Sequence, residues 1–111
     1  MKLPNVDRAV IEPAKLQDYL LSPVHSVGRF KAPFFAALGY NQEAWRQLEA
    51  DIRGQHLTQE AQPAGASRYG QKYEIRATLT GPAGRPAQVT SIWIVHAGDD
   101  VPRFVTAYPG G

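Results

Sequence analysis

Apolar residues in the first half of the chain recur every three or four positions, which is typical of amphipathic helices. This spacing predicts helices over residues 13–21, 30–38 and 42–53. Asn41 is a typical N-cap for the third of these helices, and Gly54 is expected to end it. Each apolar stripe has to face a core, so the three helices should pack against another layer.

The second half of the chain changes to the two-residue alternation of β-strands. Residues 69–79 alternate, residues 87–96 are apolar on both faces near their end, and residues 103–108 form a third strand. Short glycine-containing turns join the strands, which predicts an antiparallel meander. The expected fold class is therefore α+β, with N-terminal helices packed on one face of a small antiparallel β-sheet formed by the C-terminal half.

A chain of 111 residues supports one hydrophobic core, so residues 1–111 are predicted to be a single domain. We expect a helical half over about 1–57, a polar surface loop over about 58–67, and a sheet half over about 68–109. No apolar run approaches the roughly 18 residues that span a bilayer, and the first residues do not resemble a signal peptide. The expected location is the cytoplasm, with export by a route that needs no such signal as the alternative, and no contact with a membrane is expected.

Composition narrows the chemistry. Twelve Lys and Arg against ten Asp and Glu give a formal charge of +2, which permits a phosphate-bearing partner without requiring one. The chain has no cysteine, so disulfides, thiolate zinc sites and cysteine nucleophiles are excluded. The three histidines share no ligand spacing. We therefore expect neither a metal site nor a cofactor.

The densest polar cluster of the helical half is the segment HSVGRFK, residues 25–31. Histidine is a residue type that can move a proton near neutral pH, which makes His25 a candidate, and Arg29 and Lys31 at a helix start can hold a phosphate or an oxyanion. Gly28 would let such a group approach the backbone. Spacing alone favours a structural interpretation instead, in which Gly28 serves a turn, His25 bonds to the backbone and both cations are solvated.

A second candidate cluster lies on the last strand. The two-residue period places Phe104, Thr106 and Tyr108 on one side, so the Thr106 and Tyr108 hydroxyls lie about 7 Å apart along the strand. If that face lines a cleft, the hydroxyls can orient a scissile phosphate. The pattern alone favours the other interpretation, in which Phe104 and Tyr108 are core aromatic residues and Thr106 is simply a good strand former.

Three segments carry a family resemblance: KLQDYLLSPVHSVGRFKAPFFAALGY, TSIWIV and VPRFVTAYP. Together they resemble a family of small uncharacterised bacterial domains that occur free-standing and at the C-termini of polymorphic toxins. The resemblance covers nearly the whole chain. The order of helices and sheet, ending in a strand with Thr and Tyr, is also similar to the barnase, EndoU, colicin and RelE group of metal-independent ribonucleases, which is an analogy of fold.

The resemblance implies a ribonuclease toxin that cleaves RNA through the substrate's own 2′-hydroxyl, without a cofactor. Its expected partners are RNA and a cognate antitoxin or immunity protein. Carried over to this sequence, it implies proton transfer by His25, charge stabilisation by Lys31, orienting hydroxyls on Thr106 and Tyr108, and substrate contacts from Arg29 and Arg103. Two departures affect this transfer: Ser26 stands where the family often has proline, and Pro33 interrupts the helix that should present Lys31.

An alternative is a non-catalytic domain that binds a partner protein or RNA in a toxin–antitoxin or phage-defence pair. Spatial convergence distinguishes the two interpretations. His25 and Lys31 lie far in sequence from Thr106 and Tyr108, and only a functional site would require these four residues to meet in one cleft.

Overall fold

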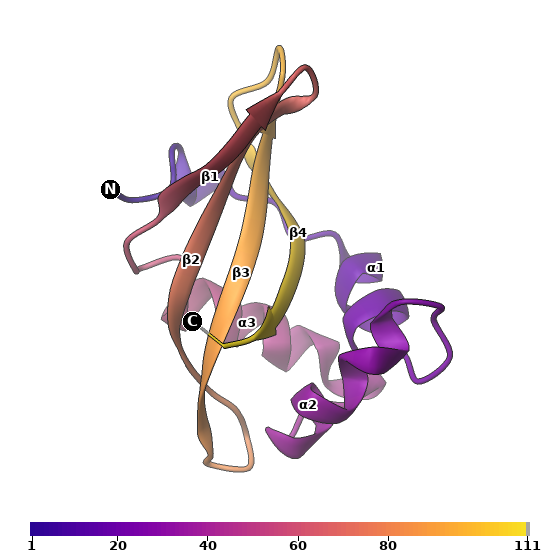
Figure 1. Ribbon diagram of the computed structural model, residues 1–111. Helices are drawn as coiled ribbons and strands as arrows, with labels where there is room; N and C mark the ends of the chain where they lie inside the picture. The colour runs from indigo at the N-terminus through magenta and orange to yellow at the C-terminus, as the bar shows by residue number, and fades with distance from the viewer. Residues whose placement is uncertain (111) are drawn as a thin grey trace.

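The computed structural model describes residues 1–110 and contains helices in the N-terminal half and a four-stranded antiparallel sheet in the C-terminal half (Figure 1). This confirms the predicted α+β class. The helical segments are η1 (Val6–Arg8), α1 (Pro13–Lys15), η2 (Leu16–Leu20), η3 (Gly28–Phe30), α2 (Ala32–Ala37), η4 (Gln42–Ala44) and α3 (Trp45–Gln55). The strands are β1 (Gln62–Ser67), β2 (Gly70–Thr80), β3 (Pro86–His96) and β4 (Pro102–Pro109).

The strands follow one another in sequence order across the sheet, as β1-β2-β3-β4, with every neighbouring pair antiparallel. The prediction of a three-stranded meander is wrong, because the sheet has a fourth strand, β1. Its residues were expected to form a surface loop because they are polar and small and include Pro63 and Gly65. The structure shows them exposed, as expected of a surface segment, but paired with β2. A strand at the edge of a sheet tolerates proline, since one side of its backbone needs no partner. A register shift between these two residues accommodates the irregularity.

The helical half also departs from the prediction in detail. Asn41 is the N-cap of η4, at the start of the third predicted helix, as expected. Its side chain accepts a hydrogen bond from the Ala44 amide at 2.9 Å. Gly54 does not end α3, which continues to Gln55. Pro33 lies in the first turn of α2, where proline is tolerated, so it does not interrupt the helix that follows Lys31.

The core lies between the helical layer and one face of the sheet. In Figure 1, α3 runs behind the sheet, and its residues Leu48 and Ile52 are 0% and 2% exposed. They join Ile75 of β2 and Trp93 of β3, which are also buried. Each fully buried side chain of this size stabilises the fold by about 1.5–3 kcal/mol relative to an exposed one. This packing fixes the position of the sheet against the helices.

The exposed edge of β4 is partly paired with the N-terminal segment. The Val10 amide donates to the Pro102 carbonyl, and the Phe104 amide donates to the Val10 carbonyl, each at 2.9 Å. Immediately afterwards the register between β3 and β4 shifts, leaving Val105 without a partner. Because of this bulge, Phe104 packs in the core while Thr106 pairs with Ile92. The prediction that Phe104 shares a face with Thr106 is therefore wrong.

Within residues 1–110, no helix combines the length and the apolar character that crossing a membrane requires.

Candidate active site

Three polar side chains from distant parts of the chain form one hydrogen-bonded group. The Lys31 ammonium donates to the Tyr19 hydroxyl at 2.7 Å and to Thr106 Oγ1 at 2.8 Å. The two hydroxyls are in turn 2.9 Å apart and share a hydrogen bond. All three side chains are half-buried. Lys31 and Thr106 are therefore in direct contact, as predicted, and Tyr19 is hydrogen-bonded to both of them.

A wide helical turn positions Tyr19. Segment η2 is a π-helix, closed by a hydrogen bond of 2.9 Å from the Leu21 amide to the Leu16 carbonyl. Leu16 and Leu20 are both fully buried and anchor this segment in the core. Single π-helical turns are rare and occur frequently at functional sites, because they redirect one side chain out of the regular spacing. The tyrosine hydroxyl thereby reaches β4.

The loop after η2 is held by its own polar side chains. Ser22 Oγ accepts hydrogen bonds from the amides of Val24 and His25, at 3.2 and 3.0 Å. His25 Nδ1 then accepts from the amides of Val27 and Gly28, both at 3.0 Å. The side chains of Ser22 and His25 therefore each hold one turn of the loop backbone in place.

These bonds assign the tautomer of His25. A ring nitrogen that accepts from two amides carries no proton, so the neutral ring holds its hydrogen on Nε2. His25 packs edge-on against Tyr19, with ring centroids 5.0 Å apart. In this arrangement the ring can donate a hydrogen bond through Nε2, while its only lone pair is engaged by the loop. This favours a donor role over the predicted role in proton transfer.

The group opens onto a groove of about 750 Å³ between the α1–η2 segment and the edge of β4. The groove is lined by Glu12, Ala14, Lys15, Asp18, Tyr19, His25, Val27, Val105 and Thr106. Lys15 adds a second positive charge, with its ammonium 5.7 Å from the centre of the Tyr19 ring. The lining of the groove thus combines one lysine and two carboxylates with two hydroxyls and a histidine, and Lys31 is bonded to both hydroxyls from behind them.

The pKa of Tyr19 reflects competing effects. Burial raises it, but the hydrogen bonds from Lys31 and Thr106 favour the phenolate. The positive charges of Lys31 and Lys15 act in the same direction. The net result is a pKa below the ordinary value of 10.0. Tyr19 is thereby suited to exchange a proton, and it is the member of the group with the clearest catalytic chemistry.

Two predicted residues lie outside the group. Arg29 stacks on the neighbouring ring of Phe30, with 4.6 Å from Cζ to the centroid, and lines a different groove of about 410 Å³. Tyr108 shares its face of β4 with Thr106, as predicted, but is 38% exposed. Among residues 1–110 no hydrogen bond joins it to Lys31 or Tyr19. Neither residue therefore meets the group in the groove.

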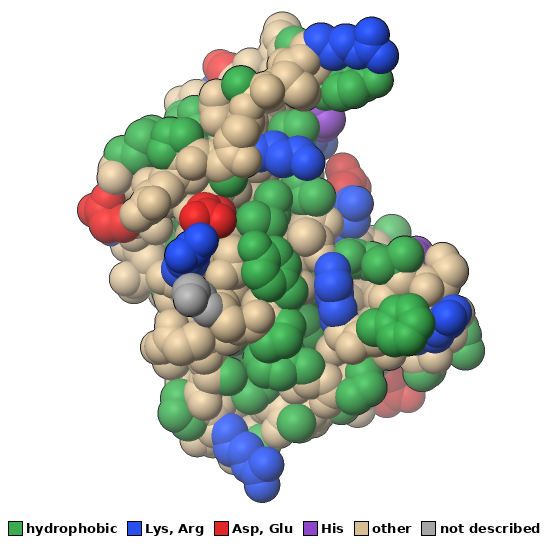
Figure 2. Space-filling view, in the orientation of Figure 1, with side chains coloured by type: hydrophobic (Ala, Val, Ile, Leu, Met, Phe, Trp, Pro, Cys, Tyr) green, Lys and Arg blue, Asp and Glu red, His purple; other side chains and the backbone are tan. Residues whose placement is uncertain are grey.

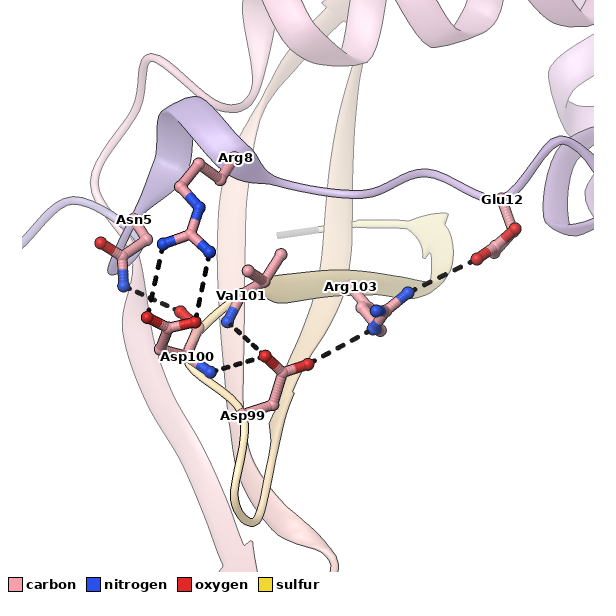
Figure 3. A network of polar contacts seen from close by, with 7 residues as sticks. All are labelled: Asn5, Arg8, Glu12, Asp99, Asp100, Val101 and Arg103. Atoms are coloured by element: carbon pink, nitrogen blue, oxygen red, sulfur yellow. Dashed lines mark hydrogen bonds and ion pairs between the residues drawn. The ribbon is translucent and has the colours of Figure 1, made fainter.

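Arg103, predicted to contact substrate, belongs to a network that ties the N-terminal segment to the β3–β4 turn (Figure 3). Its guanidinium lies between Glu12 Oε1 at 3.5 Å and Asp99 Oδ2 at 3.7 Å. Asp99 also accepts hydrogen bonds from the next two backbone amides, which lower its pKa, with the Arg103 charge adding to them. Arg8 pairs with the neighbouring Asp100 at 3.3 Å. The network gives Arg103 a structural role.

Sequence reasoning missed Tyr19 and Lys15, because both were assigned to an ordinary amphipathic helix. The available signal was local: a lysine four residues before a tyrosine, on a helix whose neighbouring leucines already fill the apolar stripe. The π-helical turn that directs the tyrosine toward β4 has no comparable sequence signature.

A separate polar cluster lies inside the core. His56 is 1% exposed, and its Nδ1 is 2.8 Å from Ser91 Oγ. The same oxygen accepts a hydrogen bond from the Trp93 indole at 2.9 Å. Burial lowers the pKa of His56, and the backbone of Ala77 opposes this effect only in part. In the part of the chain that the structure describes, no three His, Asp or Glu side chains are grouped to hold a metal ion.

Comparison with known families gives one match, to a family described as "Domain of unknown function (DUF6883)", over residues 2–111. No match was found among curated proteins or among solved structures.

Proposed function

Because the chain belongs to the DUF6883 family, whose description states no activity, we propose its function from the groove: metal-independent cleavage of RNA through the 2′-hydroxyl. The observation that carries this proposal is the group formed by Tyr19, Lys31 and Thr106. A tyrosine with a lowered pKa, directly bonded to an ammonium, supplies both a proton acceptor and a positive charge in one place.

In the proposed reaction the Tyr19 phenolate removes the proton of the 2′-hydroxyl, and the resulting oxygen attacks the adjacent phosphorus. The bond from phosphorus to the 5′ oxygen breaks, leaving a 2′,3′-cyclic phosphate. Lys31 gives a proton to the departing 5′ oxygen and regains one from the Tyr19 hydroxyl, to which it is bonded at 2.7 Å. The chain thus ends in its starting protonation state, and no proton has to come from outside the pair.

The remaining groups have supporting roles. Thr106 holds the Tyr19 hydroxyl in place through the 2.9 Å contact. The Lys15 charge and the Nε2 proton of His25 are suited to hold the phosphate oxygens, on which negative charge develops in the transition state. This assignment moves proton transfer from His25 to Tyr19 and keeps the charge-stabilising role of Lys31.

We place this activity in a bacterial toxin–antitoxin or polymorphic toxin system. The support is the resemblance of the HSVGRFK and VPRFVTAYP segments to toxin-associated domains, together with the two ammonium groups, Lys15 and Lys31, that lie beside the Tyr19 side chain. Such a toxin requires an inhibitor, and an acidic side chain of that protein would pair with Lys15 in the groove. Induced expression in a bacterial host should therefore arrest growth, and Tyr19→Phe should relieve the arrest.

The direct test is incubation of the purified protein with a single-stranded RNA in the presence of a chelator. We expect cleavage, cyclic phosphate ends and no action on the 2′-deoxy strand. Tyr19→Phe removes one oxygen and should lower the rate by at least about 100-fold, the scale of general base assistance. The matched control is Tyr69→Phe, which alters an exposed tyrosine at the β1–β2 turn and should keep full activity.

Loss of activity in chelator, or cleavage of the deoxy strand, would contradict the proposed chemistry. Retained RNA binding without cleavage would identify the alternative, a domain that binds RNA but does not cut it.

A further inference from the structure

The face of the sheet opposite α3 is uncovered and continues directly from the groove. Alternation along β2 places Lys72, Glu74 and Arg76 on this face, while Ile75 points to the core. The register then pairs Glu74 with Ile92 and Ile92 with Thr106. A residue of the proposed active site is therefore also the end of a row of side chains that crosses the open face.

The next row along the strands carries a cation and an aromatic ring two strands apart, about 10 Å from each other. Arg76 pairs with Thr90, and Thr90 pairs with Tyr108. Tyr108 is two residues from Thr106 on the same face, which separates them by about 7 Å. Its ring is 38% exposed and the Arg76 side chain is 59% exposed. Both groups are open to a ligand that extends from the groove across the sheet.

Along β2 this face carries two cations, Lys72 and Arg76, and one carboxylate, Glu74. Figure 2, which views the side away from α3, shows hydrophobic side chains in a band along the sheet, with Lys and Arg side chains on either side of it and an acidic side chain next to it. Glu74 pairs with Arg76 at 3.0 Å, whereas Lys72 forms no ion pair with the residues described. The half-buried side chains of Ile92 and Ile94 form the floor between the cations.

An exposed aromatic ring, an apolar strip and cations on one sheet face match the way proteins bind unpaired nucleic-acid strands. Bases stack on the ring and phosphates meet the cations. A duplex keeps its bases stacked inside and cannot use such a ring. From this we infer that the open face binds single-stranded RNA, with a base stacked on Tyr108 and the adjoining backbone near Lys72 and Arg76. The inference rests on the proposed function for the position of the cleaved phosphate, at Lys31 and Thr106.

The test measures binding separately from cleavage. A fluorescently labelled single strand with 2′-O-methyl groups lacks the attacking hydroxyl and stays intact, so its dissociation constant can be read by anisotropy. Tyr108→Ala should weaken binding by roughly 5- to 100-fold, the scale of one base stacked on an aromatic side chain. Tyr108→Phe keeps the ring and should bind within about twofold of the unmodified chain. A duplex of the same sequence should bind more weakly than the single strand.

Tyr69→Ala is the matched control. Tyr69 is 62% exposed, and the Arg68 side chain lies over its ring, with 5.0 Å between Arg68 Cζ and the ring centroid. Tyr69 precedes the first residue of β2, at the opposite end of the strand from Arg76. Its removal should leave binding unchanged. Lys72→Gln should weaken binding equally for all sequences and reduce the dependence of log Kd on log salt concentration by about one.

Binding that does not depend on Tyr108, or equal binding of the duplex, would overturn the inference. Absence of single-strand binding together with Tyr108-dependent self-association in sedimentation would identify a protein interface instead and would also overturn it. The two proposals fail separately. Tyr108-dependent binding of the intact strand without cleavage of ordinary RNA supports the binding face and contradicts the proposed reaction. Cleavage of ordinary RNA that is unchanged in Tyr108→Ala supports the proposed reaction and contradicts the binding face.

Discussion

A Cβ atom on residue 28 would lie 1.7 Å from the carbonyl oxygen of Tyr19, so Gly28 and Tyr19 fit together only because residue 28 has no side chain. The amide of Gly28 also donates to His25 Nδ1. The glycine thereby holds the loop against the π-helical turn that aims Tyr19 at Lys31. We expected Gly28 to let a ligand approach the backbone. In the structure the main chain of Tyr19 occupies that space instead.

Gly28→Ala should therefore destabilise the fold by about 1–3 kcal/mol or more, the usual cost of forcing atoms into a packed site. Gly54→Ala is the opposite case, since Gly54 lies inside α3 with nothing within 4 Å of an added Cβ. It should stabilise the protein by about 0.5–1 kcal/mol through better helix propensity. Urea unfolding of both variants measures the contrast. Equal effects at the two sites would contradict the packing described here.

His25 offers a test of whether the imidazole acts through the loop or through proton transfer. His25→Ala removes the acceptor of two amide hydrogen bonds and should cost about 0.5–2 kcal/mol, as for a lost helix cap. His25→Asn places a carbonyl oxygen near the position of Nδ1 and should recover most of that stability. Thermal unfolding and RNA cleavage should be measured on both variants. A fully stable but inactive His25→Asn protein would show that the ring acts in the reaction itself, by holding the phosphate through Nε2 or by transferring a proton, and not only through the loop.

Lys31 should control the ionisation of Tyr19. Lys31→Met removes a hydrogen bond and a positive charge that both favour the phenolate, so the pKa of Tyr19 should rise toward and above its ordinary value. Ultraviolet difference titration of the phenolate, with Tyr19→Phe identifying its share of the signal, measures the shift. Lys72→Met changes a lysine on the open sheet face and should leave the titration unaltered. An unchanged Tyr19 pKa in Lys31→Met would show that the two groups are not coupled.

His56 predicts how stability depends on pH. Its pKa is lowered by burial, so below the unfolded value of about 6.5 the unfolded chain binds a proton that the native state resists. The free energy of unfolding should therefore be independent of this group above about pH 6.5. It should fall below that value, with a slope of up to about 1.4 kcal/mol per pH unit.

The measurement is urea unfolding between pH 7.5 and about pH 5, with His56→Gln expected to flatten the slope and exposed His96→Gln expected to preserve it. A slope that His56→Gln leaves intact would assign the acid sensitivity to other groups.

Periodicity predicted most of the architecture because buried strands and helices repeat their apolar residues. Ile75 and Leu79 alternate on β2, and Leu48 and Ile52 recur on α3, as the core requires. Strand β1 escaped prediction because none of its residues is buried, so it has no apolar period to detect. Backbone hydrogen bonds to β2 define it, between residues that are 3 (Ser67 and Gly70) to 12 (Gln62 and Glu74) positions apart, and such bonds leave no pattern of side chains in the sequence.

The site was predictable only in part for a related reason. Lys31 and Thr106 were identified from residue chemistry and a resemblance, and the structure brings them together. Tyr19 was not identified, because the direction of its side chain depends on a π-helical turn and on the close contact of its backbone with Gly28. Neither feature produces a periodic pattern in the sequence. The bulge at Val105 similarly redirects the last strand by one residue, which simple alternation cannot anticipate.

The contact between Lys31 and Thr106 spans 75 positions of the chain, and the pairing of Val10 with Pro102 and Phe104 spans more. During synthesis, Tyr19 and Lys31 therefore leave the ribosome long before their partner strand exists. Until Thr106 has also emerged from the exit tunnel, the helical segments lack the sheet edge that forms the other wall of the groove. A nascent chain thus carries Tyr19 and Lys31 unassembled, so the proposed inhibitor would meet a finished groove only after translation has passed this point.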